Sequence, residues 1–599
     1  MEKRLTRPEV PVEQTWNLDD LFPTRADWEA EMAAMEAAIP GVTQYKGRLG
    51  ESAATMRACL GAYEALNERA VRAGTWASLR ATVDSTNEEY VGDDDRTTGL
   101  FAGLQAATSF IRSELLALPD GTVERYMEQE PGLAELRPYL NVLLQEKKHM
   151  LSPETEETVA ALGELFMSPY ITYNRAKLAD MQFDQFKDGQ GNERELSFAL
   201  YEEKYETDAD VTTRRNAFRA FAKGLKAYQN TMASTFAAEV KKNVVMARQR
   251  KYPSATHMLL QPQQVSLEAY ENLLNIIRAE LAPHMRRYAA LRKRVLGLEE
   301  LLYCDIEAPL DPGYSPKVDW DDATQMVMDA LEVMGPEYSK IMRTAIKERW
   351  VDYSDNVGKA TGAFCASPYG AQSYILMTWT GNMRGAFTLA HELGHAGHFQ
   401  LANRNQRLFN TEPSTYFVEA PSTMNEILLG QHILAKHEDK RMRRWVIMQF
   451  LATYHHNFVR HLLEGELQRR IYALAEEGKP ITANVLSSTK GAILEEFWGD
   501  AVAIDEGARL TWMRQPHYYM GLYPYTYSAG LTASTAMAQL IREEGEPAVQ
   551  RWLTVLRAGG TMGPVELMKL AGVDMTSPEP IRKAVAYVGS LIDELERLF

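Results

Sequence analysis

The chain has few cysteines, no long apolar run and no excess of basic residues. Only Cys59, Cys304 and Cys365 occur in 599 residues, far apart and in no metal-binding spacing. Such a sparse, odd set argues against a disulfide framework and favours a reducing compartment. No stretch approaches the ~18 apolar residues of a membrane-spanning helix, and no secretory signal is visible at the start. We therefore expect a cytoplasmic protein with no membrane partner.

The charge balance excludes a second class of partner. There are 81 acidic and 65 basic residues, which gives a net charge of -16 at pH 7. An acidic surface repels the phosphate backbone, so nucleic acid is not expected as a partner. Hydrophobic residues make up 45% of the chain and charged residues 24%, an ordinary balance for a globular protein with a substantial core.

Helical periodicity dominates the chain. Apolar residues recur at three- and four-residue steps over about residues 26–169 and again from about residue 196. The strongest turn sequence between these parts is Lys-Asp-Gly-Gln-Gly-Asn at 187–192, after an alternating segment that predicts a hairpin. We place a boundary there, with an N-terminal helical lobe at 1–190 and a catalytic domain at 191–599.

A strand is expected at residues 373–380, which are β-branched and aromatic. It comes shortly before the segment that carries the chemistry. An exposed strand edge offers backbone donors and acceptors to an extended peptide. The pattern fits an ordinary core strand equally well.

The chemistry is concentrated in His391-Glu392-Leu393-Gly394-His395. Two histidines four residues apart on a helix lie about 40° apart around its axis, so both imidazoles can reach one Zn²⁺. Glu392 lies beside them and can take a proton from a metal-bound water. A chance match to this pattern is expected only ~0.02 times in a chain of this composition. The motif therefore predicts one zinc ion per chain.

Catalytic zinc usually has a third protein ligand. His398 lies seven residues after His391, a rise of about 10.5 Å along a straight helix, so we expect it to support the site or contact substrate. Glu419, in Phe-Val-Glu-Ala-Pro-Ser at 417–422, is the favoured third ligand. Glu412 precedes a proline and is less suited. Glu426 lies seven residues after Glu419 on the same face, as a rival ligand or a partner of a ligand.

These segments carry a resemblance to a known family. Residues 388–398, the sequence Phe-Val-Glu-Ala-Pro-Ser-Thr-Met-Asn-Glu at 417–426 and the tyrosines near His517 resemble the thimet oligopeptidase superfamily. The opening segment at 16–23 and the chain length are similar to its oligoendopeptidase F branch. The resemblance implies a mainly α, large helical zincin-like metallopeptidase. It also implies a small β-sheet beside the active-site helix, a deep substrate channel between lobes, and cleavage of oligopeptides in preference to folded proteins.

The ten residues after His517 contain five tyrosines, whereas 28 tyrosines in 599 residues predict fewer than one. Glycine and proline among them predict a loop, where side chains can face a cleft. The resemblance assigns His517 and Tyr525 to hydrogen bonds with the developing oxyanion. Tyr519 and Tyr523 are expected to bind substrate, and Tyr518 is also eligible as the second tyrosine.

The expected activity is hydrolysis of internal peptide bonds. Zn²⁺ on His391, His395 and Glu419 would polarise the carbonyl and a water, and Glu392 would pass the water's proton to the leaving amine. Two alternatives stay open. One is a metallocarboxypeptidase of the angiotensin-converting-enzyme type, which needs a basic residue for the substrate's terminal carboxylate. The other is a non-catalytic peptide-binding protein with a vestigial zinc site.

Overall fold

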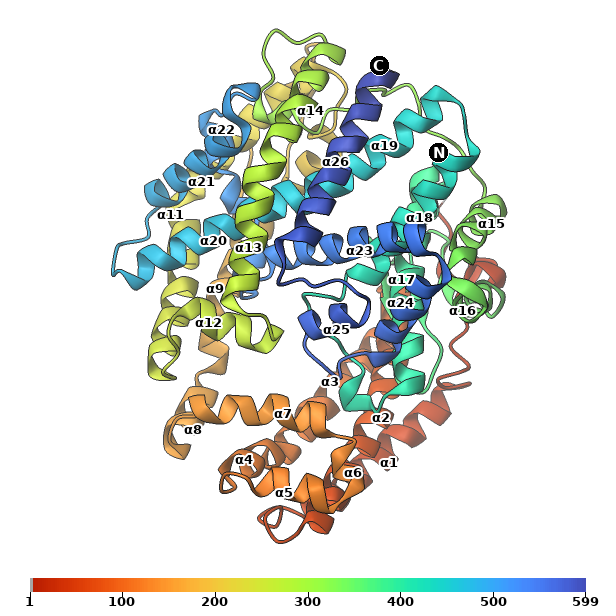
Figure 1. Cartoon of the computed structure of the whole chain (residues 1–599), viewed down its shortest axis with the longest axis vertical. Coiled ribbons are helices and arrows are strands. Elements are labelled where there is room, and N and C mark those ends of the chain that lie inside the picture. The colour runs from red at the N-terminus through yellow and green to blue at the C-terminus, as the bar shows by residue number, and fades with distance from the viewer. Residues whose placement is uncertain (1–3) are drawn as a thin grey trace.

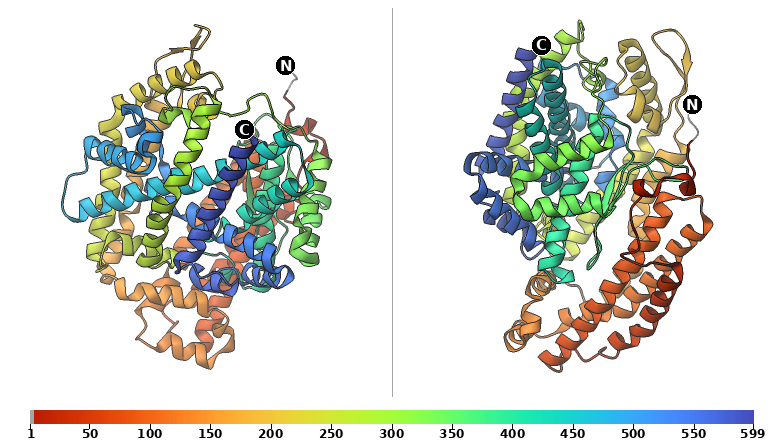
Figure 2. Two further views of the ribbon diagram at one scale, coloured as in Figure 1. Left: turned by 45° about the horizontal axis from the view of Figure 1, so that its top comes forward. Right: turned by 90° about the vertical axis from the view of Figure 1, so that its right-hand side faces the viewer.

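The first part of the chain forms a helical lobe. The computed structural model describes residues 4–599. The lobe's helices are α1 (Arg25–Thr43), α2 (Ala53–Val83), α3 (Glu88–Thr108), α4 (Phe110–Ala117), α5 (Thr122–Gln129), α6 (Pro131–Ala134), α7 (Arg137–Glu146) and α8 (Pro153–Ala161). Helices α1 to α3 run side by side (Figure 2, right). Their apolar faces enclose a cluster of buried residues that extends from Trp16 to Leu140.

The rest of the chain forms a larger helical body (Figure 1). Its helices are α9 (Gly163–Arg175), α10 (Phe198–Leu200), α11 (Val211–Gln249), α12 (Ala255–Leu260), α13 (Leu267–Ile276), α14 (Ala282–Val295), α15 (Trp320–Leu331), α16 (Gly335–Lys347), α17 (Met383–Asn405), α18 (Ala420–Lys436), α19 (Lys440–Tyr454), α20 (His461–Glu476), α21 (Ala483–Trp498), α22 (Glu506–Arg509), α23 (Pro524–Glu544), α24 (Glu546–Ala558), α25 (Pro564–Leu570) and α26 (Pro578–Leu598). The mainly α prediction is confirmed. Within residues 4–599, no helix combines the length and the apolar character needed to cross a membrane.

The body has its own hydrophobic core. This second cluster of buried residues extends from Tyr173 to Leu595. Tyr173, Ala176 and Phe186 belong to it, although they precede the boundary expected at residue 190. Several helices in both lobes begin after a polar residue whose side chain caps the first turn. Ser266, for example, accepts a hydrogen bond from the backbone N–H of Ala269 at the start of α13.

Two small sheets interrupt the helices. Strands β1 (Phe186–Lys187) and β2 (Glu193–Arg194) form the expected hairpin. Strands β3 (Val351–Asp352), β4 (Phe364–Ala366) and β5 (Tyr374–Leu376) form a sheet in the order β3-β5-β4. The strand expected within 373–380 therefore exists as β5. It is the central strand of its sheet, so the suggestion that its edge could hold a peptide is wrong. The edge strand on that side is β4, which pairs antiparallel with β5.

Strand β5 lies between the two cores. Successive side chains of a strand point to opposite faces. Accordingly, Tyr374 and Leu376 belong to the N-terminal cluster, whereas Ile375 belongs to the cluster of the body. Trp16 meets the ring of Tyr374 edge-on at 6.3 Å. The strand thus joins the N-terminal lobe to the part of the body that carries α17.

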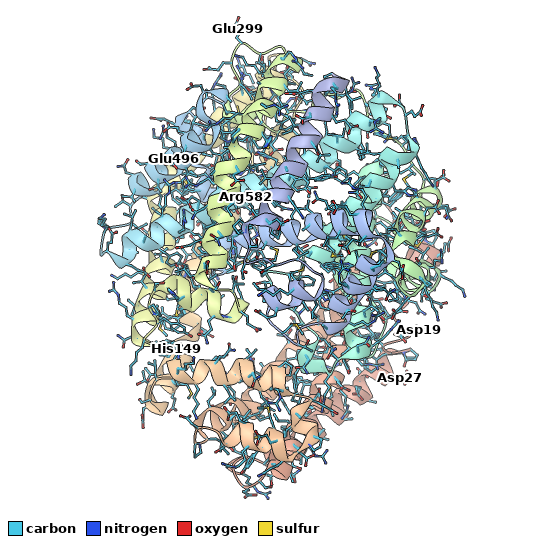
Figure 3. The ribbon with its side chains drawn as sticks, in the orientation of Figure 1. Asp19, Asp27, His149, Glu299, Glu496 and Arg582 are labelled. Carbon is cyan, nitrogen blue, oxygen red and sulfur yellow. The ribbon has the colours of Figure 1, made fainter. Side chains whose placement is uncertain are left out.

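The N-terminal lobe touches the body at a second place. His149, labelled in Figure 3, follows α7 and stacks on Tyr252 with ring centroids 3.6 Å apart. Its Nδ1 donates a hydrogen bond of 2.9 Å to the carbonyl oxygen of Arg250. The side chain of Arg250 pairs with Glu156 of α8 at 2.7 Å. The N-terminal lobe therefore contacts the body both at β5 and at the segment around His149.

A buried ionic network fixes the ends of the three-stranded sheet. Asp352 is fully buried and accepts hydrogen bonds from Lys359 Nζ at 2.7 Å and Arg7 Nη2 at 2.5 Å. Lys359 Nζ also donates to the carbonyl oxygens of Asp352, Ser354 and Met377. One ammonium group therefore ties the ends of β3 and β5 to the loop that leads to β4.

Replacing Asp352 by Asn should destabilise the protein strongly, because Lys359 and Arg7 would lose their buried counter-charge. A cost of about 3–5 kcal/mol is expected for breaking such a pair. The control is Asp355→Asn, which removes the exposed partner of Arg4 and should cost ~1 kcal/mol or less. Thermal unfolding of the two variants compares them. Equal melting temperatures would contradict the role given to the network.

Candidate active site

Helix α17 carries the two histidines of the motif. Asn382 caps the helix, because its Oδ1 accepts the backbone N–H of Gly385 at 3.1 Å. His391 and His395 follow one turn apart, with ring centroids 5.1 Å from each other. Both side chains are partly exposed, to 27% and 14%, so a ligand or substrate can reach them.

Helix α18 brings Glu419 to the histidines. Glu419 immediately precedes this helix. The side-chain amide of Asn425 donates to the carbonyl oxygen of Ala390 at 3.1 Å, which ties α18 to α17. Gly394 allows the close approach, since a Cβ atom there would lie 2.5 Å from both Pro421 O and Ser422 Cα. Only glycine permits this separation of the two backbones.

The three side chains form one potential metal site. The Nε2 atoms of His391 and His395 each lie 3.4 Å from Oε2 of Glu419. In the described part of the chain, this is the one group of three His, Cys, Asp or Glu side chains whose ligand atoms lie close enough for a metal, within 4.8 Å of one another. Two imidazole nitrogens and a carboxylate oxygen are a donor set suited to catalytic zinc. The residues therefore fit the ion that the motif implies.

Glu426 supports a ligand. Nδ1 of His391 donates a hydrogen bond of 2.7 Å to Oε1 of Glu426. This bond selects the tautomer that leaves Nε2 of His391 free for a metal, a common arrangement around zinc-binding histidines. Of the two roles open to Glu426, the geometry favours the partner of a ligand. Glu412 is exposed and lies outside the cluster.

Glu392 is less exposed than the three potential metal ligands. Its side chain is buried, with 5% of the residue exposed. Burial raises the pKa of this carboxyl above its ordinary value, which brings it closer to that of an efficient general base. Strand β4 packs against α17, the helix that carries Glu392.

Residues 205–587 match the model described as peptidase family M3. The chain belongs to this family. Residues 114–183 match a second model, described as oligopeptidase F. The family membership that the sequence resemblance implied is thereby confirmed, and the chain is a metalloendopeptidase.

Relatives extend the match to the whole chain. Oligopeptidase PepF of Bacillus subtilis is 34% identical over 99% of this chain and 88% of that protein. Group B oligopeptidase PepB of Streptococcus agalactiae is 27% identical over 99% of this chain and 98% of its own. The crystal structure of oligoendopeptidase-F from Enterococcus faecium covers 96% of this chain and 99% of its own, with 26% identity and a TM-score of 0.74.

The first turn of α23 brings two tyrosines together. Tyr523 and Tyr527 are four residues apart and lie on one face of the helix, with ring centroids 5.4 Å apart. Burial and the charge of Glu419 raise the pKa of both phenols, and contact with Tyr523 raises that of Tyr527 further. His517 stacks on Tyr523 at 5.4 Å, and its Nε2 lies 3.4 Å from the Tyr527 hydroxyl. The helix that carries Tyr527 packs against Glu419 at Gly530, and His517 adjoins both phenols.

The structure places Tyr525 apart from His517, Tyr523 and Tyr527, which disfavours its expected role at the oxyanion site. On a helix, a separation of two residues corresponds to a rotation of about 200°. Tyr525 therefore points away from the helix face that carries Tyr523 and Tyr527. It is 1% exposed and its phenol bonds to Oε1 of Gln263. Tyr527, which the sequence analysis did not consider, lies beside Tyr523 and His517 instead. The available signal was its spacing of four from Tyr523 in a helix that begins at Pro524.

Two expected substrate-binding residues lie elsewhere. The Tyr519 hydroxyl is 2.7 Å from Thr235 Oγ1 of α11, and the ring packs on Tyr173 of α9, so Tyr519 belongs to that helix contact. His398 is fully buried against Phe417, and burial lowers its pKa to about 3. Its position within the core favours support of α17 over contact with substrate.

Tyr518, the remaining eligible tyrosine, is also buried. Its hydroxyl bonds to Glu464 of α20, which pairs with Lys490. The phenol is therefore part of a buried polar cluster and is removed from the candidates for the oxyanion site.

Replacing Gly394 by Ala should weaken metal binding, because the added methyl group forces α18 and Glu419 away from the histidines. We expect about a 10- to 100-fold loss of zinc affinity, comparable to the loss of a supporting partner of a ligand. Competition with a chelator of known affinity measures it. Gly99→Ala, where a Cβ meets nothing within 4 Å, is the control. Unchanged affinity in Gly394→Ala would contradict the account of the close approach.

Proposed function

We propose that the chain binds one zinc ion through His391, His395 and Glu419 and cleaves internal peptide bonds of oligopeptides. The observation that supports this most directly is the convergence of two Nε2 atoms and one carboxylate oxygen beside the buried carboxyl of Glu392. The relatives named oligopeptidase or oligoendopeptidase F match nearly the full chain, which supports oligopeptides as the substrate class.

Zinc in such a site supplies a water of lowered pKa and polarises the scissile carbonyl. The Glu392 carboxylate would take a proton from the attacking water as the oxygen of that water bonds to the carbonyl carbon. Glu392 then delivers the proton to the amide nitrogen as the carbon–nitrogen bond breaks. The raised pKa of Glu392 suits both transfers, because a weakly basic carboxylate would hold the proton less well.

Tyr523 and Tyr527 stabilise the carbonyl oxygen as it gains negative charge. Their raised pKa values keep both phenols protonated at neutral pH, so both can donate hydrogen bonds. Burial lowers the pKa of His517 to about 4, and the neutral ring donates from Nδ1 to Gln515 Oε1 at 2.9 Å. Its Nε2 lies 3.4 Å from the Tyr527 hydroxyl and can accept the single phenolic proton only until that proton turns to the carbonyl oxygen. We therefore assign His517 to holding Tyr527 in place in the free enzyme instead of a direct bond to substrate.

Strand β4 is the expected support for the substrate backbone. It pairs with β5 along one edge, and within the described residues its other edge meets no strand. An extended peptide can add to such an edge through main-chain hydrogen bonds. Because β4 packs against α17, that peptide would lie beside the helix that carries Glu392.

The arrangement of the two lobes around a substrate channel and the cellular location of the protein are also part of this proposal. We retain an N-terminal lobe that covers one side of a substrate channel, with the body carrying the chemistry. Cys59, Cys304 and Cys365 are all free thiols, which supports a reducing compartment such as the cytoplasm.

A carboxypeptidase or a non-catalytic binding protein is not favoured by the family match. A peptide blocked at both ends, with a fluorophore and a quencher, tests this, since only an endopeptidase cleaves it.

Glu392→Gln should bind zinc normally and lose several orders of magnitude in kcat, because the amide cannot accept the water's proton. Zinc content by elemental analysis and turnover of the blocked peptide are measured on the same preparation. Near-normal turnover would remove Glu392 from the role of general base. Loss of zinc would instead show that the variant disturbs the ligands.

Tyr527→Phe should lower kcat about 10²- to 10³-fold, the effect of removing one donor to a developing oxyanion. Tyr525→Phe is the matched control two residues away and should stay within a few-fold of the unmodified enzyme. Steady-state kinetics with the blocked peptide separate the two. A larger loss in Tyr525→Phe than in Tyr527→Phe would restore the assignment made from the sequence.

A further inference from the structure

Three histidine rings surround Tyr527. His461 lies nearly parallel to the phenol, with centroids 4.3 Å apart and planes inclined by 19°. His517 and His456 meet it edge-on, at 5.8 Å and 6.1 Å. His461 is thus the one of these three histidines that covers a face of the phenol ring.

An unusual backbone turn places His461 there. The π-helical turn η11 (His455–Arg460) leads directly into α20, whose first residue is His461. In an α-helix, residues five apart point about 140° away from each other. The wider π turn aligns them, and the rings of His456 and His461 lie 4.4 Å apart. Such turns occur frequently at functional sites.

The position of His461 leaves one of its ring nitrogens without a hydrogen bond. The residue is 3% exposed, and its Nδ1 has no hydrogen-bond partner among the described residues. A buried polar atom without a partner is costly, and an apolar ring would fill the space without that cost. Nor does His461 belong to the group that could hold a metal.

We propose that His461 is a positioning residue for Tyr527, an inference that rests on the oxyanion role proposed above for this tyrosine. The α23 backbone restricts χ1 of Tyr527, while χ2 of an aromatic side chain has a broad minimum. The flat face of His461 fixes the plane of the phenol, and Nε2 of His517, 3.4 Å from the hydroxyl oxygen, borders its outer end. A displacement of about 1 Å in such a donor can cost about 10²-fold in rate.

The test compares variants of His461 in two backgrounds, the unmodified enzyme and Tyr527→Phe. His461→Ala and His461→Leu remove the flat face, and we expect kcat to fall about 10- to 100-fold with little change in KM. His461→Phe keeps a flat ring and should stay within about threefold. In the Tyr527→Phe background, none of these changes should lower kcat further. Zinc content and circular dichroism identify variants that fail to fold, and His461→Leu, which fills the volume, replaces His461→Ala in that case.

Two results would overturn the inference while leaving the proposed function intact. One is normal kcat in His461→Leu alongside an impaired Tyr527→Phe. The other is the same loss from the His461 change in both backgrounds, which would mean that the ring does not act through Tyr527. Near-normal kcat in Tyr527→Phe itself would instead overturn the oxyanion role, and the role of His461 with it.

Discussion

The site depends on how closely α17 and α18 approach each other. At Gly394 the two backbones leave no room for a Cβ atom, and this contact brings Glu419 to the two histidines. Asn425 then ties the helices together through the carbonyl oxygen of Ala390, and Tyr338 bonds to Asn425 from α16. The ligand distances therefore follow from helix packing, not from the flexibility of the glutamate side chain.

Other parts of the site are arranged around the same contact. Helix α23 packs on it through Gly530, where a Cβ would lie 3.2 Å from that of Glu419, and this helix carries Tyr523 and Tyr527. Strand β5 enters from the other side and joins the two hydrophobic cores. The buried Asp352–Lys359 pair holds the strand ends in register with the loop before β4. Metal ligands, phenols and edge strand are thus supported by rigid elements, as a preorganised site requires.

The sequence predicts the local parts of this arrangement better than the distant ones. The spacing of His391 and His395 on one helix is a local property. Glu419 is singled out by the short segment around it, Phe-Val-Glu-Ala-Pro-Ser at 417–422. The choice between Tyr525 and Tyr527 depends on where a helix begins, because one residue changes the direction of a side chain by about 100°. The central position of β5 depends on β3 and β4, which come earlier in the chain, and a strand pattern does not reveal strand order. His398 looked like a polar residue near the metal, and only the packing of Phe417 shows that it is buried.

The central claim is that one zinc ion is held by residues from two helices that close packing brings together. A crystal structure of the protein grown with zinc, with anomalous diffraction recorded on both sides of the zinc absorption edge, tests it most directly. The account predicts one strong anomalous peak per chain, at about 2.0–2.2 Å from Nε2 of His391, Nε2 of His395 and a carboxylate oxygen of Glu419. A peak bound by Glu426 in place of Glu419, or the absence of any peak between α17 and α18, would contradict it.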